Sequence, residues 1–340
     1  MSKVSAVGSM KVFCGIDVSA ATLAVAVQQE GSEVLQQREF ANTAAGHKKL
    51  VAWLLKSGWP VRVSLEATGI YSQDVALALD AAGGIEVALL NPLVAQRFAH
   101  TLRRSKTDAA DALALAEYSR RMPFVPWRRP PLAALRLRAI SRHIATLRED
   151  HSRLRSRLHA ALASAATPGC VSKDLKDSMA RLQKSRLKLV REALAVIAQD
   201  AELERKFQLL NRITGIAEAS AVQLLGELAG MDPSMSVRQW VAHSGLDPQH
   251  RSSGTSVHPP SRISRRGNRH LRLALYMPAL VASRFDPHMK AFYTQLKERH
   301  KASLQALVAL QRKMLHAIYG SFKSNTPYNG AKLFPQINIA

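Results

Sequence analysis

Cysteine and long apolar runs are both scarce in this sequence of 340 residues, and each scarcity excludes a class of protein. The two cysteines, Cys14 and Cys170, are too few for a disulfide framework and lack the spacing of a metal site. The first ten residues lack the apolar segment of a signal peptide. The longest apolar stretches fall well short of the about 18 residues that a membrane span needs. We therefore expect a cytoplasmic protein.

Acidic residues are also scarce, with 25 against 48 lysines and arginines, which gives a formal net charge of +23. Such a charge repels itself, and its usual counter-charge is a polyanion, most often nucleic acid. The excess is uneven, because residues 1–127 contain 13 basic and 11 acidic side chains while the remainder contains 35 and 14. Hydrophobic residues make up 47%, which excludes wholesale disorder. We therefore expect the part after residue 127 to bind the polyanion.

Strands and helices alternate in the first part of the chain. The predicted strands are residues 11–18, 22–29, 33–40, 61–66 and 85–90, and the predicted helices are residues 43–56, 72–82, 94–102 and 108–120. This order, three strands followed by alternating helices and strands, predicts an α/β domain over residues 10–127, with a mixed central sheet and helices on its faces.

Four prolines in residues 122–131 mark a boundary, after which the pattern becomes helical. Apolar residues three and four apart, with one histidine among them, then form a coiled-coil stripe: Leu137, Ile140, Ile144, Leu147, His151, Leu154 and Leu158. A second helical segment is predicted over residues 175–210. A break near Pro168 and Gly169 indicates an antiparallel hairpin. We expect a basic coiled-coil region over residues 128–212 and a mostly helical domain over residues 213–340.

Four acids stand out by their positions in the first domain. Asp17 and Glu66 each end an apolar strand, and Asp108 and Asp111 lie three residues apart at the start of a helix. Several carboxylates brought together repel one another, and hard divalent cations relieve that repulsion. Two Mg²⁺ ions bridged by carboxylates are a recurring device for phosphoryl transfer. The order of elements and acids resembles the ribonuclease-H-like fold, and more narrowly the Holliday-junction resolvases.

A basic segment over residues 251–272 contains six arginines and no acid, and it passes from a Ser/Gly/Pro loop into an apolar helix. The arginines are Arg251, Arg262, Arg265, Arg266, Arg269 and Arg272. Such a segment is expected to follow a phosphate backbone. Nearby arginines can also stabilise an attacking serine oxygen and the charge of a phosphoryl transition state. The residues alone leave the candidates open: Ser252, Ser253, Ser256, Ser261 and Ser264.

Motifs along nearly the whole chain resemble the DEDD-type insertion-sequence transposases, which are bridge-RNA-guided recombinases, and the related pilin-gene invertases. The motifs are Gly15-Ile16-Asp17, Glu66-Ala67-Thr68-Gly69, Asn91-Pro92, Lys106-Thr107-Asp108 with Asp111, Gly245-Leu246-Asp247-Pro248, Ser253-Gly254 and Arg262-Ile263-Ser264. Thr214 and Ala217 depart from the proline and glycine usual in the family's hairpin, which the segment 213–225 resembles.

The resemblance implies roles for particular residues. Asp17, Glu66, Asp108 and Asp111 would bind Mg²⁺, and Ser253 would attack the scissile phosphodiester and hold the strand end as a phosphoserine. A second transesterification would rejoin that end to a new strand. The implied partners are donor and target DNA, a structured guide RNA and further copies of the chain, as a dimer to tetramer, in the bacterial nucleoid.

Two other functions compete with recombination. A metal-dependent, structure-selective endonuclease would use water as the nucleophile and form no protein–DNA bond. A non-catalytic nucleic-acid-binding protein would not break strands at any Mg²⁺ concentration. The four acids argue against the second, and the basic serine segment favours recombination over the first.

Overall fold

The computed structural model describes residues 11–32, 35–102, 107–249 and 262–337. The chain divides into two compact units, Met1–Arg129 and Pro130–Ala340. The first is a mixed α/β unit built on a sheet, and the second is mostly helical.

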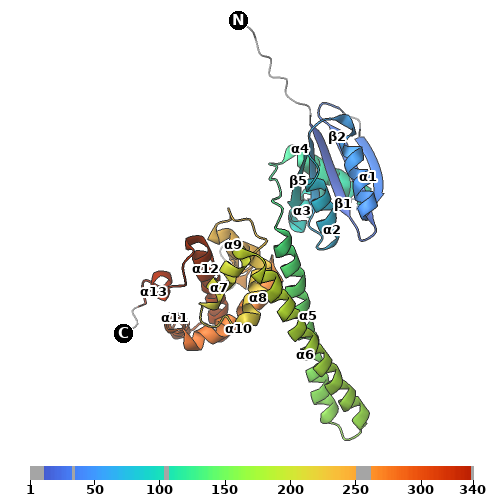
Figure 1. Cartoon of the computed structure of the whole chain (residues 1–340). Coiled ribbons are helices and arrows are strands. Elements are labelled where there is room, and N and C mark those ends of the chain that lie inside the picture. Colours follow the sequence, from blue (N-terminus) through green and yellow to red (C-terminus); the bar gives the residue numbers. More distant parts are fainter. Residues whose placement is uncertain (1–10, 33–34, 103–106, 250–261, 338–340) are drawn as a thin grey trace, which may run out of the picture. The chain divides into compact units, whose positions relative to one another are not determined.

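A five-stranded sheet forms the centre of the first unit (Figure 1). Its strand order is β3-β2-β1-β4-β5. The strands are β1 (Val12–Val18), β2 (Thr22–Gln29), β3 (Leu35–Ala41), β4 (Val61–Glu66) and β5 (Ile85–Leu90). The first three pair antiparallel, whereas β4 is parallel to both β1 and β5. The mixed sheet predicted from the sequence is therefore confirmed.

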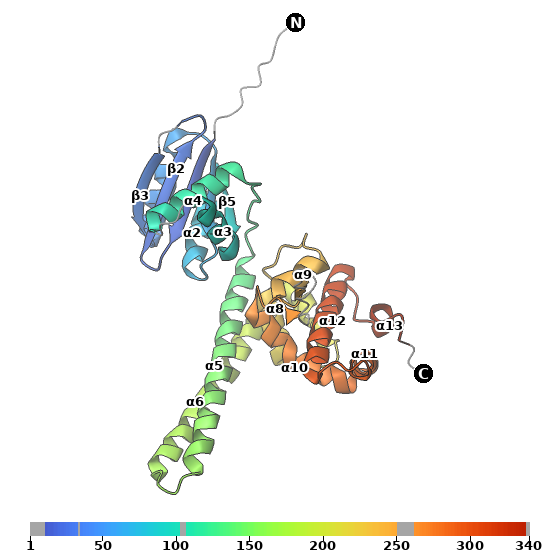
Figure 2. The same cartoon turned by 180° about the vertical axis from the view of Figure 1, so that it is seen from behind.

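Helices cover both faces of this sheet. They are α1 (Ala44–Leu54), which continues as the 3-10 helix η1 (Leu55–Ser57), then α2 (Tyr71–Asp80), α3 (Pro92–Leu102) and α4 (Asp108–Arg121). Alternate residues of β1, such as Cys14 and Ile16, pack with Leu50 of α1 and Leu79 of α2 in one core. The other set faces α4, which crosses the opposite side of the sheet (Figure 2).

Two long helices, α5 (Leu132–Leu162) and α6 (Gly169–Ala198), begin the second unit and pack along each other as an antiparallel hairpin (Figure 1). The helical segment predicted over residues 175–210 consists of two helices, because α6 ends at Ala198 and α7 (Ala201–Asn211) starts anew. The Asp200 side chain accepts hydrogen bonds from the backbone N–H groups of Glu202 and Leu203, so it caps α7 and separates the two helices.

The rest of the second unit packs around one large apolar core. Its helices are α8 (Glu218–Leu228), α9 (Val237–Ser244), α10 (Arg269–Phe285), α11 (Pro287–Glu298), α12 (Ser303–Ser324) and α13 (Gly330–Leu333), and its short strands are β6 (Pro248–Gln249) and β7 (Arg262–Ile263). Gly215, in the turn before α8, has a φ of 94°, and a β-carbon there would lie 2.4 Å from the carbonyl oxygen of Pro278. The glycine therefore serves close packing against α10. Within the described ranges, no helix is both long and apolar enough to cross a membrane.

Candidate active site

Two of the predicted acids lie at the carboxyl ends of adjacent parallel strands. The register pairs Ile16 of β1 with Leu65 of β4, and Asp17 and Glu66 are the next residues along each strand. Side chains alternate along a strand, so Asp17 faces the same side as Gly15, which lies against α4. The strands therefore bring both acids to the same edge and the same face of the sheet.

Gly15 allows α4 to approach this edge closely. A β-carbon at Gly15 would lie 2.0 Å from the Ala112 carbonyl oxygen and 2.2 Å from the Ala116 backbone nitrogen, far inside contact distance. The Thr107 hydroxyl oxygen accepts a hydrogen bond from the Ala110 backbone at 3.2 Å and caps the start of the helix. The crossing point thus directs the first turn of α4, which carries the other two predicted acids, toward the ends of β1 and β4.

All four acids line one cavity of about 560 Å³, which we call the acid cavity. Burial raises the pKa of Asp17 to about 6, and the charges of Asp108, Asp111 and Glu66 add to that rise. The two acids of α4 are three residues apart and occupy one helix face. The fold therefore concentrates negative charge in one place.

The acid cavity brings carboxylate, hydroxyl and amide oxygens together in a partly apolar wall. Among the residues that the structure describes, no three His, Cys, Asp or Glu side chains meet as a preformed metal-binding group. Mg²⁺ needs no such cage, because it is usually held by one or two carboxylates together with waters and phosphate oxygens. The Thr68 hydroxyl, in the cavity wall, is buried and has no hydrogen-bond partner within the described part of the chain. This donor set fits Mg²⁺ bound together with a phosphate.

Sequence reasoning did not find two polar residues of the acid cavity, Gln96 and His100, and it gave Thr68 only as part of the motif Glu66-Ala67-Thr68-Gly69. Gln96 and His100 lie four residues apart on α3, a spacing that places them on one face of the helix. That spacing is common on any exposed helix, so it gave no signal of a site. Both side chains are placed to contact whatever enters the acid cavity.

The basic segment of the second unit starts from a two-stranded ribbon, in which Pro248 pairs with Ile263 and Gln249 with Arg262. The intervening residues lie outside the described part of the chain, and they include the predicted nucleophile Ser253 and Arg251. Three other candidate serines, Ser252, Ser256 and Ser261, lie there too. The chain therefore enters residues 250–261 from β6 and leaves them at β7.

Ser264, the remaining candidate serine, has a structural role. Its hydroxyl donates a hydrogen bond to the Asp247 carboxylate, and its oxygen accepts one from the Arg266 backbone at 3.3 Å. These contacts tie the residues after β7 to the residues before β6. They occupy both hydrogen-bonding functions of the hydroxyl.

The arginines that the structure describes in this segment differ in their partners. Arg262, Arg265 and Arg266 are exposed. Arg269 is also exposed and lies 3.6 Å from Glu149 of α5. Arg272 instead donates a hydrogen bond to the Ser244 carbonyl oxygen at 2.7 Å, so it links α10 to the end of α9. Four of the predicted nucleic-acid-binding arginines are therefore open to a phosphate, and Arg272 is partly used in the fold.

Comparison with known proteins gives this arrangement a context. Residues 14–166 match the model of the DEDD transposases of IS110 type, and residues 207–294 match the transposase IS116/IS110/IS902 family. Together the two matches cover well over half of the chain. This chain belongs to the IS110 family of transposases. It is therefore a DNA recombinase, and the acids at positions 17, 66, 108 and 111 fall inside the first match.

Relatives of the transposase include proteins of similar length. The pilin gene-inverting protein of Moraxella bovis is 27% identical over 325 residues, which cover 94% of this chain and 98% of that protein. The insertion element IS116 protein of Streptomyces clavuligerus is 25% identical over 94% of this chain and 97% of its own length. A putative transposase for IS117 of Streptomyces coelicolor is 32% identical over 33% of this chain and 28% of its own length.

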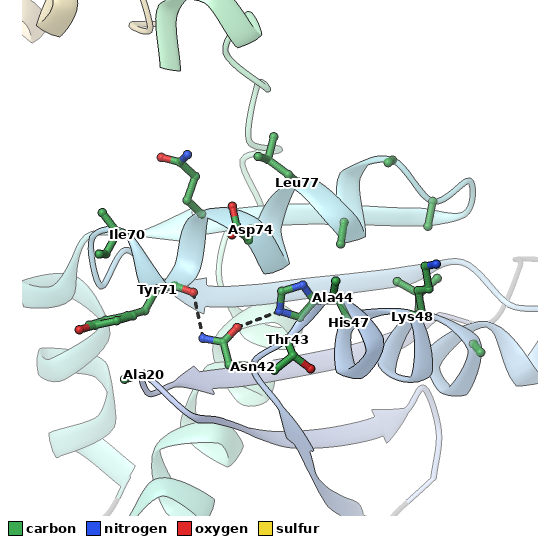
Figure 3. Close-up of a pocket in the computed structure, with 16 residues that line it drawn as sticks. Ala20, Asn42, Thr43, Ala44, His47, Lys48, Ile70, Tyr71, Asp74 and Leu77 are labelled. Carbon is green, nitrogen blue, oxygen red and sulfur yellow. Dashed lines mark hydrogen bonds between the residues drawn. The ribbon is translucent and has the colours of Figure 1, made fainter. Parts of the chain in front are cut away.

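A larger cavity, of about 910 Å³, lies between α1 and α2 of the transposase (Figure 3). At one end the Asn42 amide donates to the Ser19 and Tyr71 carbonyl oxygens and accepts from His47 Nε2 at 2.8 Å (Figure 3). Burial lowers the pKa of His47, although nearby Asp74 opposes the change, so the neutral ring suits this contact. The network joins α1 and α2 to the loop after β1. None of the four acids lines this cavity.

Proposed function

We propose that this transposase cuts and rejoins DNA by Mg²⁺-dependent transesterification, with the acid cavity acting on the scissile phosphate and Ser253 as the nucleophile. The first unit would then be of the ribonuclease-H-like type, as in Holliday-junction resolvases. The observation that carries the proposal is the gathering of Asp17, Glu66, Asp108 and Asp111 around one cavity. Carboxylates from two strand ends and one helix turn meet there although they are far apart in sequence.

The chemistry conserves phosphodiester bonds. The Ser253 oxygen would bond to phosphorus while the bond to the departing sugar oxygen breaks; the serine loses its proton and the departing oxygen gains one. A hydroxyl of the partner strand would then attack the same phosphorus and release the serine. Mg²⁺ at the four acids would neutralise charge on the phosphate. Arg262, Arg265, Arg266 and Arg269 would hold the strand backbone in the meantime.

The partners follow from the resemblance and the charge. A structured RNA encoded by the element would choose donor and target DNA, and the chain would act as a dimer to tetramer. The Moraxella relative is named for inverting a pilin gene, a reaction that requires strands to be cut and rejoined. The 35 basic residues after position 127 supply the charge for both nucleic acids.

A metal-dependent junction endonuclease is the second candidate. One observation favours it: the acid cavity is lined entirely by residues of the first unit and needs nothing from the serine segment. In that case water would attack the phosphate. The strand break would then not depend on Ser253.

Asp108→Asn tests the role of the acid cavity. With full-length protein, Mg²⁺, co-expressed element RNA and end-labelled junction DNA, we expect strand cleavage to fall by about 10²–10³-fold, the scale of losing one preorganised electrostatic contact in a transition state. DNA affinity is expected to stay near wild type. Asp74→Asn is the matched control, because Asp74 also lies in the first turn of a helix but lines the cavity between α1 and α2. Full cleavage by Asp108→Asn would refute the carboxylate site.

A further inference from the structure

A third cavity, of about 270 Å³, lies within the second unit between α5, α8 and α10. We call it the α10 cavity; its polar and aromatic lining residues include Arg142, Arg148, Glu149, Gln223, His270 and Tyr276. It shares no residue with the acid cavity. Its volume is near the lower end of the roughly 300–1,000 Å³ of small-molecule sites, so it suits one small ring system with its attached groups.

One wall of the α10 cavity is an apolar strip that the fold leaves uncovered. Leu273, Tyr276 and Met277 are 51%, 39% and 39% exposed. They occupy positions i, i+3 and i+4 of α10, so they share one face of the helix. Their neighbours Ala274 and Leu275 are buried in the core. The strip therefore presents a tyrosine ring between two flexible apolar side chains at the surface.

The opposite wall is polar, and most of its charges are already compensated. Arg142 binds the buried Glu227 carboxylate through two hydrogen bonds of 2.8 and 2.9 Å. Glu149 lies 3.6 Å from Arg269 and 4.0 Å from Arg153.

Two groups of this wall are free to bind a ligand, and a third group, the His270 ring, is uncharged. Arg148 is exposed and has no ion-pair partner among the described residues, and the Gln223 amide likewise makes no hydrogen bond within them. Burial and the charge of Arg142 lower the pKa of His270, so its ring is neutral near pH 7. Of the described residues at the rim, Arg148 thus offers a free guanidinium and Gln223 a free amide.

We propose that the α10 cavity binds a single unpaired nucleotide of a nucleic-acid strand, with the base on the Tyr276 ring and a backbone phosphate on Arg148. A flat apolar wall beside an amide and a guanidinium is the combination by which proteins hold unpaired bases. The inference rests on the proposed function, because it takes the occupant to be nucleic acid. It adds that part of the bound nucleic acid is single-stranded at this point.

The charge of the second unit argues for this occupant over a second copy of the chain. Residues 130–340 contain 33 basic and 14 acidic side chains, so two such surfaces repel each other. A nucleotide carries the opposite charge to the rim. It also supplies a ring to cover the exposed strip.

Tyr276→Ala tests the stack in the full-length protein. By fluorescence anisotropy we expect it to weaken binding of single-stranded oligonucleotides by about 5- to 150-fold, the size of one base–aromatic stack, and to leave duplex DNA binding unchanged. Tyr276→Phe keeps the ring and is expected to bind as wild type does. Phe285→Ala is the matched control, because Phe285 is an exposed aromatic residue on the same helix but does not line the cavity.

Arg148→Gln tests the phosphate contact, and Arg155→Gln is its matched control. Both arginines are exposed on α5, seven residues and so nearly two turns apart, and only Arg148 lines the cavity. Each variant loses one positive charge, so general electrostatic weakening is equal in both. We expect Arg148→Gln to lose more affinity for single strands than Arg155→Gln.

The outcomes separate this inference from the proposed function. Single-strand affinity that is unchanged in Tyr276→Ala, with duplex binding intact, would overturn the inference alone. A fall in oligomeric mass by light scattering without any loss of affinity would assign the strip to a second copy and also overturn it. A wild-type protein that binds neither strands nor duplexes would overturn both. Single-stranded DNA and RNA oligonucleotides of matched sequence show whether the bound nucleotide belongs to DNA or to RNA. The strand that loses more affinity in Tyr276→Ala is the one whose base stacks on Tyr276.

Discussion

Asp17 is the acid whose ionisation the fold opposes. It lies beside three other carboxylates at the end of β1, and burial together with their charges raises its pKa from 3.8 to about 6. In the free protein near neutral pH, a charged Asp17 therefore sits among like charges. Such strain is typical of sites that gain their stability from a bound cation.

The raised pKa of Asp17 predicts how stability depends on pH. Between about pH 4 and pH 6 the folded state holds a proton on this carboxyl that the unfolded chain has lost, so stability falls as pH rises through this window. Without divalent cations, Asp17→Asn is expected to melt at a higher temperature than wild type at pH 8 and at the same temperature near pH 4. Thermal unfolding at the two pH values measures this.

Millimolar Mg²⁺ provides the second arm of that measurement. It is expected to raise the melting temperature of the wild type at pH 8 and to have less effect on Asp17→Asn, because a ligand of the folded state stabilises it by mass action. Asp74→Asn should respond to Mg²⁺ as wild type does. A variant Asp17→Asn that is less stable than wild type at pH 8 would contradict this account of the cavity.

At the scale of residues, the sequence predicted the acids of the cavity but not its other walls. Asp17 and Glu66 could be found because each ends an apolar strand, and adjacent parallel strands bring such ends together. Gln96 and His100 could not, because their place in the cavity depends on how α3 packs. Gly15 could also have indicated the position of α4, since a glycine inside a strand often marks the close approach of another backbone.

At the scale of elements, Glu227 of α8 connects the hairpin to the basic segment. Its side chain is only 2% exposed and accepts hydrogen bonds from Arg142 of α5 and from the Asn268 amide at 2.6 Å. Burial alone would raise the pKa of Glu227, but these hydrogen bonds outweigh it and hold the pKa below its usual value. Asn268 also caps α10, so the carboxylate fixes the helix start from which the arginines extend.

Removing this carboxylate is expected to destabilise the second unit. We predict that Glu227→Ala costs about 2–3 kcal/mol, below the roughly 3–5 kcal/mol for a fully buried pair because the Arg142 side chain is 39% exposed and can be hydrated. Urea denaturation measures the change. Glu202→Ala is the control, since its pairs with Arg205 and Lys206 are on the surface and are worth at most about 1 kcal/mol. Equal losses of unfolding free energy in Glu227→Ala and Glu202→Ala would refute the view that Glu227 is a buried link between the hairpin and α10.

The elements themselves were predictable where the pattern was strong. The strands at residues 22–29, 61–66 and 85–90 have the predicted bounds, because β-forming runs end there at turn residues. The division between α6 and α7 was missed because Gln199 and Asp200 interrupt the helices without a glycine or proline. Apolar residues recur at helical spacing on both sides of that interruption, and the capping role of Asp200 is clear only from its contacts.

At the scale of the whole molecule, the proposed mechanism would divide the chemistry between the two units. The acids belong to the nearly neutral first unit, and the exposed arginines belong to the basic second unit. The sequence indicated a boundary near this point from the uneven charge and from the four prolines of residues 122–131. The proposed transesterification by Ser253 would require groups from both units to act on one phosphate.

A covalent protein–DNA adduct tests this account most directly. Full-length protein is incubated with end-labelled element-junction DNA, Mg²⁺ and co-expressed element RNA, and the products are separated on a denaturing gel for the wild type and Ser253→Ala. The account predicts a labelled adduct with the wild type and none with Ser253→Ala. Mg²⁺-dependent cutting without an adduct, equal in both proteins, would contradict it and assign the attack on the phosphate to water.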